Sequence, residues 1–185
     1  MKTLIFNGSP KKNGDTEKLV YELTVHLNGK IKIISCYDDI HPCKDCRYCW
    51  KNIGCNINDE MQNVYDYIKD CDVIVLASPI WFSSLSGPLL NLASRIQSIW
   101  VANHFQKKTI LNKEKSGVII LVGAQIETAD IPDKTAQGIM RHMNVRRPNI
   151  SKIFSLNTNN LPADKDNLAL EKCRKVAEFL NNRYD

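Results

Sequence analysis

The chain has 185 residues, of which 43% are hydrophobic and 24% are charged, and these values exclude disordered, collagen-like and low-complexity proteins. This length predicts a single domain, residues 1–185, with enough chain to bury a core without disulfides or metals. The net charge of +5 comes from scattered pairs of basic residues without interleaved aromatics, which argues against nucleic acid as a partner and fits an anionic small ligand.

No segment predicts a targeting signal or a membrane span. The apolar run at the N-terminus is too short for a secretory signal. The 22 residues from Val73 to Ser94 lack charge, but they contain two prolines, a glycine and several serines, unlike a spanning helix. We therefore expect a cytoplasmic protein that does not contact a membrane.

Apolar runs alternate with helical patterns along the chain. Strands are expected over residues 3–6, 31–36, 73–77, 117–122 and 150–156. Apolar residues at helical spacing predict helices over residues 16–27, 61–68, 89–100, 136–143 and 169–180. The strand at 73–77 is apolar on both faces, which is typical of a parallel sheet covered by helices on both sides. The alternation predicts an α/β fold whose ligands bind at the carboxyl ends of the strands.

The loop after the first strand has the composition of a phosphate site. It runs from Asn7 to Thr16 and opens a helix, whose first N–H groups and positive dipole end favour an anion. Ser9 and Thr16 supply hydroxyl groups, and Lys11 supplies a positive charge. The spacing fits neither a Walker A loop nor a dinucleotide-binding loop. The alternative is a tight turn in which Asp15 or Thr16 caps the helix.

The loop after the third strand carries two adjacent aromatic residues, Trp81 and Phe82, within Ser78–Pro88. At the carboxyl end of a strand, such side chains could stack against a ligand. They could equally fill the core or a dimer interface. Their position alone does not decide between these interpretations.

Seven cysteines are present, and four of them lie within thirteen residues of a loop expected over about residues 37–58. Such clustering indicates metal or redox chemistry. A C-x2-C-x2-C-x5-C pattern is formed by Cys43, Cys46, Cys49 and Cys55. Steps of three residues can aim the first three thiolates at one point. The flexible Ile53-Gly54 pair then allows the chain to bring the fourth thiolate to the same point. The pattern suits a [4Fe–4S] cluster, redox-active thiols remain an alternative, and zinc is less natural because it usually takes two separated pairs. Buried filler positions are expected for Cys36, Cys71 and Cys173.

The first and third loops together resemble those of the flavodoxin-like NAD(P)H-dependent FMN reductases. The resemblance rests on Gly-Ser-Pro-basic-x-x-Gly-x-Thr after strand one and Ser-Pro-x-aromatic-aromatic-x-Ser-x-Ser-Gly after strand three. It implies a flavodoxin-like three-layer sandwich with a five-stranded parallel sheet in the order 2-1-3-4-5. It also implies an FMN site formed by Ser9, Lys11, Asn13, Asp15, Thr16, Pro79, Ile80, Trp81, Phe82 and Gly123. The turn after strand four has one glycine, Gly123, where the family often has several.

The cysteine motif is similar to that of the iron–sulfur flavoproteins, a branch of the same family. The resemblance implies an FMN-dependent oxidoreductase that takes hydride from NAD(P)H and passes electrons to a small-molecule or protein acceptor, with Cys43, Cys46, Cys49 and Cys55 as cluster ligands. It implies a homodimer or homotetramer. The alternatives are a cluster-free reductase of flavins, quinones or nitro compounds and a flavodoxin-type electron carrier. No residue pattern designates a general acid or another catalytic side chain.

Overall fold

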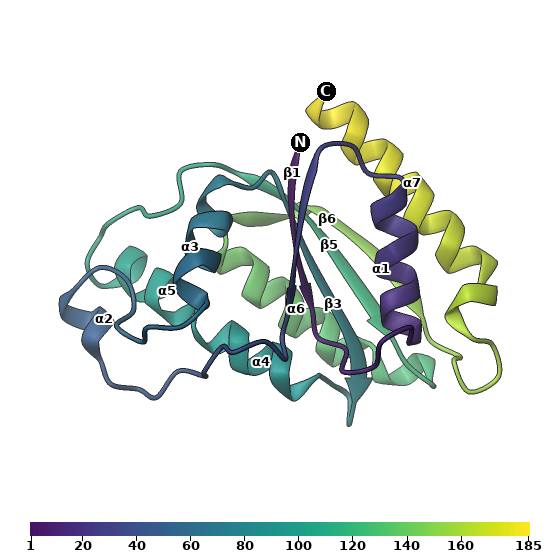
Figure 1. Cartoon of the computed structure of the whole chain (residues 1–185), viewed down its shortest axis with the longest axis horizontal. Helices are drawn as coiled ribbons and strands as arrows, with labels where there is room; N and C mark the ends of the chain where they lie inside the picture. Colours follow the sequence, from purple (N-terminus) through teal and green to yellow (C-terminus); the bar gives the residue numbers. More distant parts are fainter.

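A parallel sheet lies between two layers of helices in the computed structural model, which describes all of residues 1–185 (Figure 1). Its parallel strands are β1 (Lys2–Asn7), β2 (Lys30–Ser35), β3 (Val73–Trp81), β5 (Lys115–Val122) and β6 (Val145–Ser155). They pair in the order β2-β1-β3-β5-β6, which confirms the expected order 2-1-3-4-5. A short sixth strand, β4 (Ser84–Leu85), was not predicted; it pairs antiparallel with the end of β3.

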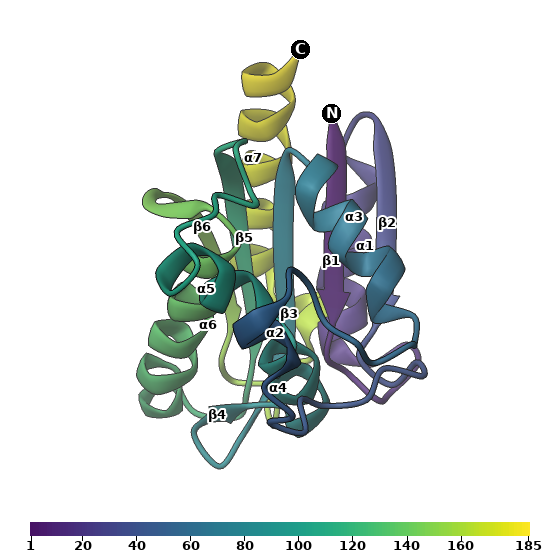
Figure 2. The same cartoon turned by 90° about the vertical axis from the view of Figure 1, so that its left-hand side faces the viewer.

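Helices cover both faces of the sheet, as the apolar strands predict. On one face lie α1 (Asp15–Val25) and α7 (Asn167–Tyr184); on the other lie α3 (Met61–Asp70), α4 (Gly87–Ser94), α5 (Gln97–His104) and α6 (Asp130–His142) (Figures 1 and 2). Two short 3-10 helices, η1 (Ile126–Thr128) and η2 (Ala163–Lys165), precede α6 and α7. Every residue of β5 is buried, so each large aliphatic side chain there contributes about 1.5–3 kcal/mol. None of the helices is both long and apolar enough to cross a membrane.

The single helix expected over residues 89–100 is instead two helices, α4 and α5, separated at Arg95 and Ile96. The carbonyl oxygen of Arg95 accepts hydrogen bonds from the Tyr65 hydroxyl at 2.8 Å and the Ser98 hydroxyl at 3.2 Å. The Ile99 amide bonds to the Ile96 carbonyl three residues back, and not to that of Arg95. The apolar spacing therefore predicted the buried face, but it did not predict the break at Arg95, where two hydroxyl groups bond to the backbone carbonyl.

The cysteine-rich segment is more ordered than a plain loop. It contains the one-turn helix α2 (Tyr48–Lys51), preceded by Asp45 and Arg47 in left-handed backbone conformations. From the end of β2 the segment runs across the outside of α4 and α5 before it enters α3 (Figure 1). The helical layer on this side of the sheet thus carries the cysteines.

Candidate functional site

Four loops meet at the carboxyl edge of the sheet because β1, β3, β5 and β6 run parallel. The loops after β1 and β3 are bonded directly to each other. The Gly8 amide donates to the Ala77 carbonyl at 2.8 Å, and the Ser86 hydroxyl donates to the Gly8 carbonyl at 2.7 Å. Ser86 is itself fixed by its amide, which donates to the Ser78 hydroxyl at 2.9 Å. The two motifs singled out in the sequence therefore form one structural unit.

The first loop presents free backbone donors at the start of α1. The amides of Asp15, Thr16 and Glu17 have no hydrogen-bond acceptor, as expected for the first turn of a helix. Ser9 is half-buried, and its hydroxyl accepts the Lys11 amide at 3.3 Å. Three free amides at a helix N-terminus can bind an anionic phosphate.

Neither Asp15 nor Thr16 caps α1, so the capping alternative is wrong. Gly14 occupies the N-cap position without a side-chain hydrogen bond. The Asp15 carboxylate instead accepts the Ala163 amide at 2.9 Å, which ties the helix to η2. Asp15 therefore offers the loop its backbone N–H, and its negative charge is directed toward the C-terminal segment.

Asn13 and Glu17 form a contact that the sequence did not suggest. The Asn13 backbone is in the left-handed region, with φ of 57°, and its amide donates to the Glu17 carboxylate. The Glu17 carboxylate thus accepts the hydrogen bond of one backbone amide of this loop, that of Asn13. Asparagine tolerates this backbone conformation better than most residues do.

Trp81 and Phe82 lie on a tight hairpin between β3 and β4. Phe82 and Ser83 have φ values of 50° and 54°, the pattern of a type I′ turn, without the glycine that such turns favour. Phe82 is fully exposed and Trp81 is 41% exposed. The interpretation that these two side chains fill the core of the chain is therefore wrong, and stacking against a ligand or a second chain remains.

The turn after β5 is held close to the end of β3. A β-carbon on Gly123 would lie 3.2 Å from the Ile80 side chain, so a larger residue would press on Ile80. The Gly123 amide donates to the Ser155 carbonyl at 2.9 Å, and its carbonyl accepts both the amide and the hydroxyl of Thr158 at 3.1 Å. Gly123 and Ile80 are thus adjacent, and half-buried Pro79 directly precedes Ile80 in β3.

The four clustered cysteines line one pocket, together with Arg95 and parts of α2 and α5. Cys43 and Cys46 are exposed, and Cys49 and Cys55 are half-buried. Burial is the main reason that the pKa of the Cys49 thiol is raised. No set of three or more histidine, cysteine, aspartate or glutamate side chains is arranged to hold a metal ion. The fold therefore gathers the predicted ligands around one space without converging them on one point.

Side chains from the surrounding helices hold the backbone of the cysteine-rich segment. The Ser94 hydroxyl accepts the Cys43 amide at 2.9 Å, and the Gln106 amide group donates to the Cys49 carbonyl at 2.7 Å. The Gln62 amide group donates to the Cys55 carbonyl at 2.9 Å. These contacts fix the backbone near three of the four cysteines.

A ring stack adds to this support. Trp50 of α2 stacks on Phe105 with ring centroids 4.5 Å apart. Phe105 follows α5 directly, so the stack joins α2 to the end of that helix. The segment that the sequence predicted as a loop, over about residues 37–58, is therefore held in place against the neighbouring helices.

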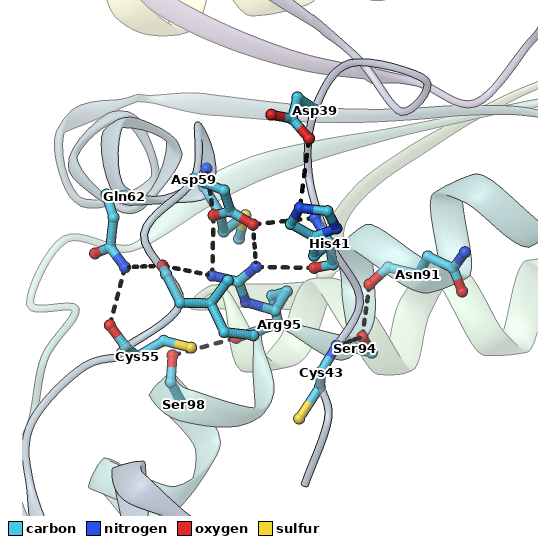
Figure 3. A network of polar contacts seen from close by, with 12 residues as sticks. Asp39, His41, Cys43, Cys55, Asp59, Gln62, Asn91, Ser94, Arg95 and Ser98 are labelled. Atoms are coloured by element: carbon cyan, nitrogen blue, oxygen red, sulfur yellow. Dashed lines mark hydrogen bonds and ion pairs between the residues drawn. The ribbon is translucent and has the colours of Figure 1, made fainter. Parts of the chain in front are cut away.

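Arg95 and Asp59 form a buried ion pair at the base of this substructure, and sequence reasoning missed both residues (Figure 3). The shorter contact joins Nη1 of Arg95 to Oδ2 of Asp59 at 2.6 Å. Burial opposes the charge of Asp59, but hydrogen bonds from Arg95 and from the His41 amide hold the pKa of this carboxyl below its ordinary value. One feature of the sequence could have revealed the buried arginine: Arg95 stands inside an apolar helical stripe, between Leu92 and Ile96.

The remaining cysteines occupy the positions expected for them. Cys36, Cys71 and Cys173 are all buried, and burial is the main reason that the pKa of each thiol is raised to about 12. A thiol with such a pKa remains protonated at neutral pH and is a poor nucleophile. The prediction of three inert buried fillers is confirmed.

A doubly wound parallel sheet in this order, with a phosphate-type loop after its first strand, defines a flavodoxin-like α/β protein. Residues 1–149 match the family model described as NADPH-dependent FMN reductase, and the chain belongs to this family. The resemblance drawn from the two loop motifs is thereby confirmed.

The similar curated proteins bear one name. An iron–sulfur flavoprotein of Methanosarcina thermophila is 25% identical over 188 residues, covering 97% of this chain and 93% of the relative. An iron–sulfur flavoprotein of Methanocaldococcus jannaschii is 30% identical over 112 residues, 58% of each chain. One of Archaeoglobus fulgidus is 31% identical over 107 residues, covering 56% of this chain and 53% of the relative. The chain thus spans little more than half the length of the latter two relatives, and nearly all of the first.

Two solved structures of similar fold are named as a reductase and an oxidoreductase. An FMN-dependent NADH-azoreductase of Bacillus anthracis, in complex with FMN, has a TM-score of 0.73 at 16% identity and covers 98% of this chain and 100% of that one. An NAD(P)H:quinone oxidoreductase of Methanothermobacter marburgensis has a TM-score of 0.77 at 14% identity, with coverage of 97% and 96%. At these identities the likeness establishes the flavodoxin-like fold.

Proposed function

We propose that this chain is an FMN-dependent oxidoreductase that accepts hydride from NAD(P)H and delivers electrons through a [4Fe–4S] cluster held by Cys43, Cys46, Cys49 and Cys55. The observation that carries the proposal is the meeting of these cysteines in one pocket, on a backbone held by side chains of α3, of α4 and of the turn after α5. The family match supports FMN and NADPH as cofactor and electron donor. The curated relatives' shared name supports an iron–sulfur centre.

The carboxyl edge of the sheet fits FMN. The free amides at the start of α1, with Ser9, Lys11, Asn13 and Thr16, would hold the phosphate. Trp81 and Phe82 would contact the ring system, together with Pro79, Ile80 and the Gly123 turn. When bound, FMN supplies an exchange between a two-electron donor and one-electron acceptors, while these residues bind and orient it.

The cysteine pocket fits an iron–sulfur cluster by its donor chemistry. Each iron of a [4Fe–4S] cluster binds one cysteine thiolate, so the four sulfurs need to surround a space and not to meet at a point. Basic residues in the same segment, Lys44, Arg47 and Lys51, would offset negative charge there. A buried N–H of Arg95, beside the pocket, has no acceptor within the chain.

The acceptor and the oligomeric state are part of the proposal. The cysteines lie over α4 and α5, whereas the phosphate loop opens α1 on the other face of the sheet (Figure 1). This placement favours a homodimer or homotetramer in which the cysteines of one copy approach the flavin of another. A small-molecule or protein acceptor would then take electrons at the exposed cysteine face.

The proposal is tested on anaerobically purified wild-type protein. We expect an absorption spectrum of flavin plus a broad iron–sulfur band, one cluster's worth of iron and labile sulfide, and oxidation of NADPH or NADH that depends on a one-electron acceptor. Flavin and turnover without iron would identify the cluster-free reductase of flavins, quinones or nitro compounds. Flavin without any turnover from reduced nicotinamide would identify a flavodoxin-type carrier.

The double variant Ser9→Ala, Thr16→Ala should weaken FMN binding by roughly 3 kcal/mol or more, since hydrogen bonds to charged groups contribute about 1.5–3 kcal/mol each. Equilibrium dialysis of the apoprotein measures the affinity. Thr135→Ala, which removes a hydroxyl bonded only to the Ile131 carbonyl on α6, is the matched control and should bind FMN normally. An unchanged affinity in the double variant would contradict the phosphate assignment.

Trp81→Leu should restore part of the flavin fluorescence that binding quenches, because we expect Trp81 to stack against the ring. Its side chain is 41% exposed, so its removal should leave the thermal stability of the apoprotein nearly unchanged. Fluorescence titration with FMN and thermal unfolding measure the two effects. Trp100→Leu on α5 serves as a control that keeps full quenching. Full quenching together with lost stability in Trp81→Leu would show a structural role instead.

A further inference from the structure

We propose that Arg95 is the positioning residue of the cysteine centre. Held by Asp59, it joins the two ends of the cysteine-rich segment. It also offers its charge and one unpaired N–H to the group that the four cysteines bind. The inference rests on the proposed function, because it concerns the same centre. It adds two residues, outside the cysteine motif, that would tune that centre.

The first observation is the burial of the pair. Arg95 is 2% exposed, and the side chains of Arg95 and Asp59 are 0% and 1% exposed. Arg95 lies at the break between α4 and α5, where its backbone carbonyl accepts the hydroxyls of Tyr65 and Ser98. Replacing a buried ion pair with apolar residues is often neutral or stabilising. The stability of the fold therefore gives little reason for a charged pair at this position.

The second observation is that the guanidinium joins the two ends of the cysteine-rich segment. Nη1 donates to the His41 carbonyl at 2.8 Å, two residues before Cys43. Nη2 donates to the Ile57 carbonyl at 3.4 Å, two residues after Cys55. Both nitrogens also donate to the Asp59 carboxylate, at 2.6 and 3.1 Å. One planar group thus clamps the entry and the exit of the segment (Figure 3).

Asp59 completes the clamp from the other side. Its Oδ2 accepts the His41 amide at 3.0 Å, and its Oδ1 accepts the Met61 amide at 3.1 Å. The carboxylate therefore fixes both the orientation of Arg95 and the start of α3. A lysine in place of Arg95 would keep the charge, but it would lack the fork that reaches both ends.

The third observation is the orphaned donor. Of the five N–H groups of Arg95, the four on Nη1 and Nη2 match four acceptor contacts, whereas the buried Nε has no hydrogen-bond partner. Arg95 lines the pocket that the four cysteines share. A buried unpaired N–H is unfavourable unless an acceptor is bound nearby. A sulfur of the bound centre would be such an acceptor.

This arrangement predicts opposite effects on the reduction potential of the centre. Nearby positive charge and hydrogen bonds to sulfur stabilise the reduced, more negative form and raise the potential. Arg95→Gln should therefore shift the midpoint potential downward. Asp59→Asn, which leaves the arginine charge unbalanced, should shift it upward. A general loosening of the segment would shift both variants in the same direction.

A second measurement, the rate of trypsin cleavage, can be made on protein that holds no cluster. Lys44, Arg47 and Lys51 are exposed trypsin sites within the segment. In the apoprotein, cleavage at these sites should be about tenfold faster in Arg95→Gln and in Arg95→Lys than in the wild type, because the clamp is lost. In the loaded protein, Arg95→Lys keeps the positive charge but loses the Nε donor, so its potential should lie between those of the wild type and Arg95→Gln. The lysine variant thus separates positioning from charge.

The experiment combines anaerobic redox titration of the cluster signal with timed trypsin digestion of the apoprotein. Asp133→Asn, a change at another buried aspartate, whose ion-pair partner Lys152 is exposed, is the control and should alter neither readout. If Arg95→Gln fails to fold, the double variant Arg95→Gln, Asp59→Asn removes both charges. It should have a potential between those of the single variants, with fast cleavage.

Unchanged potentials and unchanged cleavage in a wild type that carries its full cluster would overturn the inference and leave the proposed function intact. Shifts of both potentials in one direction would overturn the role of the charge. Absence of iron from the wild type would refute the cluster itself, and the trypsin comparison would then decide alone whether Arg95 positions the segment.

Discussion

Cys49→Ser should remove the iron–sulfur cluster almost completely while FMN remains bound. Cys49 is half-buried and lines the same pocket as the other three proposed ligands. A serine hydroxyl is a poor substitute for a thiolate that binds iron. The phosphate loop belongs to β1 and α1, and its one hydrogen bond toward the cysteine-rich segment, from the Cys36 amide to the Asn7 carbonyl, lies seven residues before the first proposed ligand. The flavin should therefore be unaffected.

Iron and labile-sulfide counting on anaerobically purified protein measures the loss, and the flavin absorbance measures what remains. Electron delivery to one-electron acceptors should fall with the iron. Cys173→Ala is the matched control, because that thiol is buried between α7 and α1 and should not influence the cluster. Full iron content in Cys49→Ser would refute the ligand assignment, and loss of flavin along with iron would show that the two sites depend on each other.

Gly8→Ala should both destabilise the chain and weaken FMN binding. A β-carbon at this position would lie 2.7 Å from the Ser86 hydroxyl, 2.9 Å from the Leu89 β-carbon and 3.1 Å from the Ala77 carbonyl. Two of these neighbours are backbone or near-backbone atoms that cannot move aside, so the loops after β1 and β3 must separate. Overpacking of this kind costs about 1–3 kcal/mol.

Denaturant unfolding of the apoprotein and equilibrium dialysis with FMN measure the two losses. Gly138→Ala in the middle of α6 is the matched control, because its β-carbon would meet nothing within 4 Å. That variant should be more stable by about 0.5–1 kcal/mol, since alanine favours helix over glycine. Normal stability with normal FMN affinity in Gly8→Ala would show that the two loops are not rigidly joined at this site.

Local chemistry in the sequence was sufficient to predict much of the fold and the helix start that follows the first loop. Uninterrupted apolar strands such as Val73–Ala77 can be stable only in a sheet buried on both faces, so they predicted the parallel sheet. The first-loop motif determined a helix start with free amides, because the first turn of any helix lacks acceptors. The cysteine spacing predicted thiolates aimed at one point, whereas the four side chains line one pocket without converging there.

Only the tertiary structure decided how these parts are connected. Asp15 is directed away from the phosphate loop because an amide 148 residues later, that of Ala163, binds its carboxylate. At the break between α4 and α5, the Arg95 carbonyl accepts the Tyr65 hydroxyl from a different helix. The buried partnership of Arg95 with Asp59 joins residues 36 positions apart. Periodicity and spacing describe neighbours along one element, whereas each of these contacts depends on which elements the sheet brings side by side.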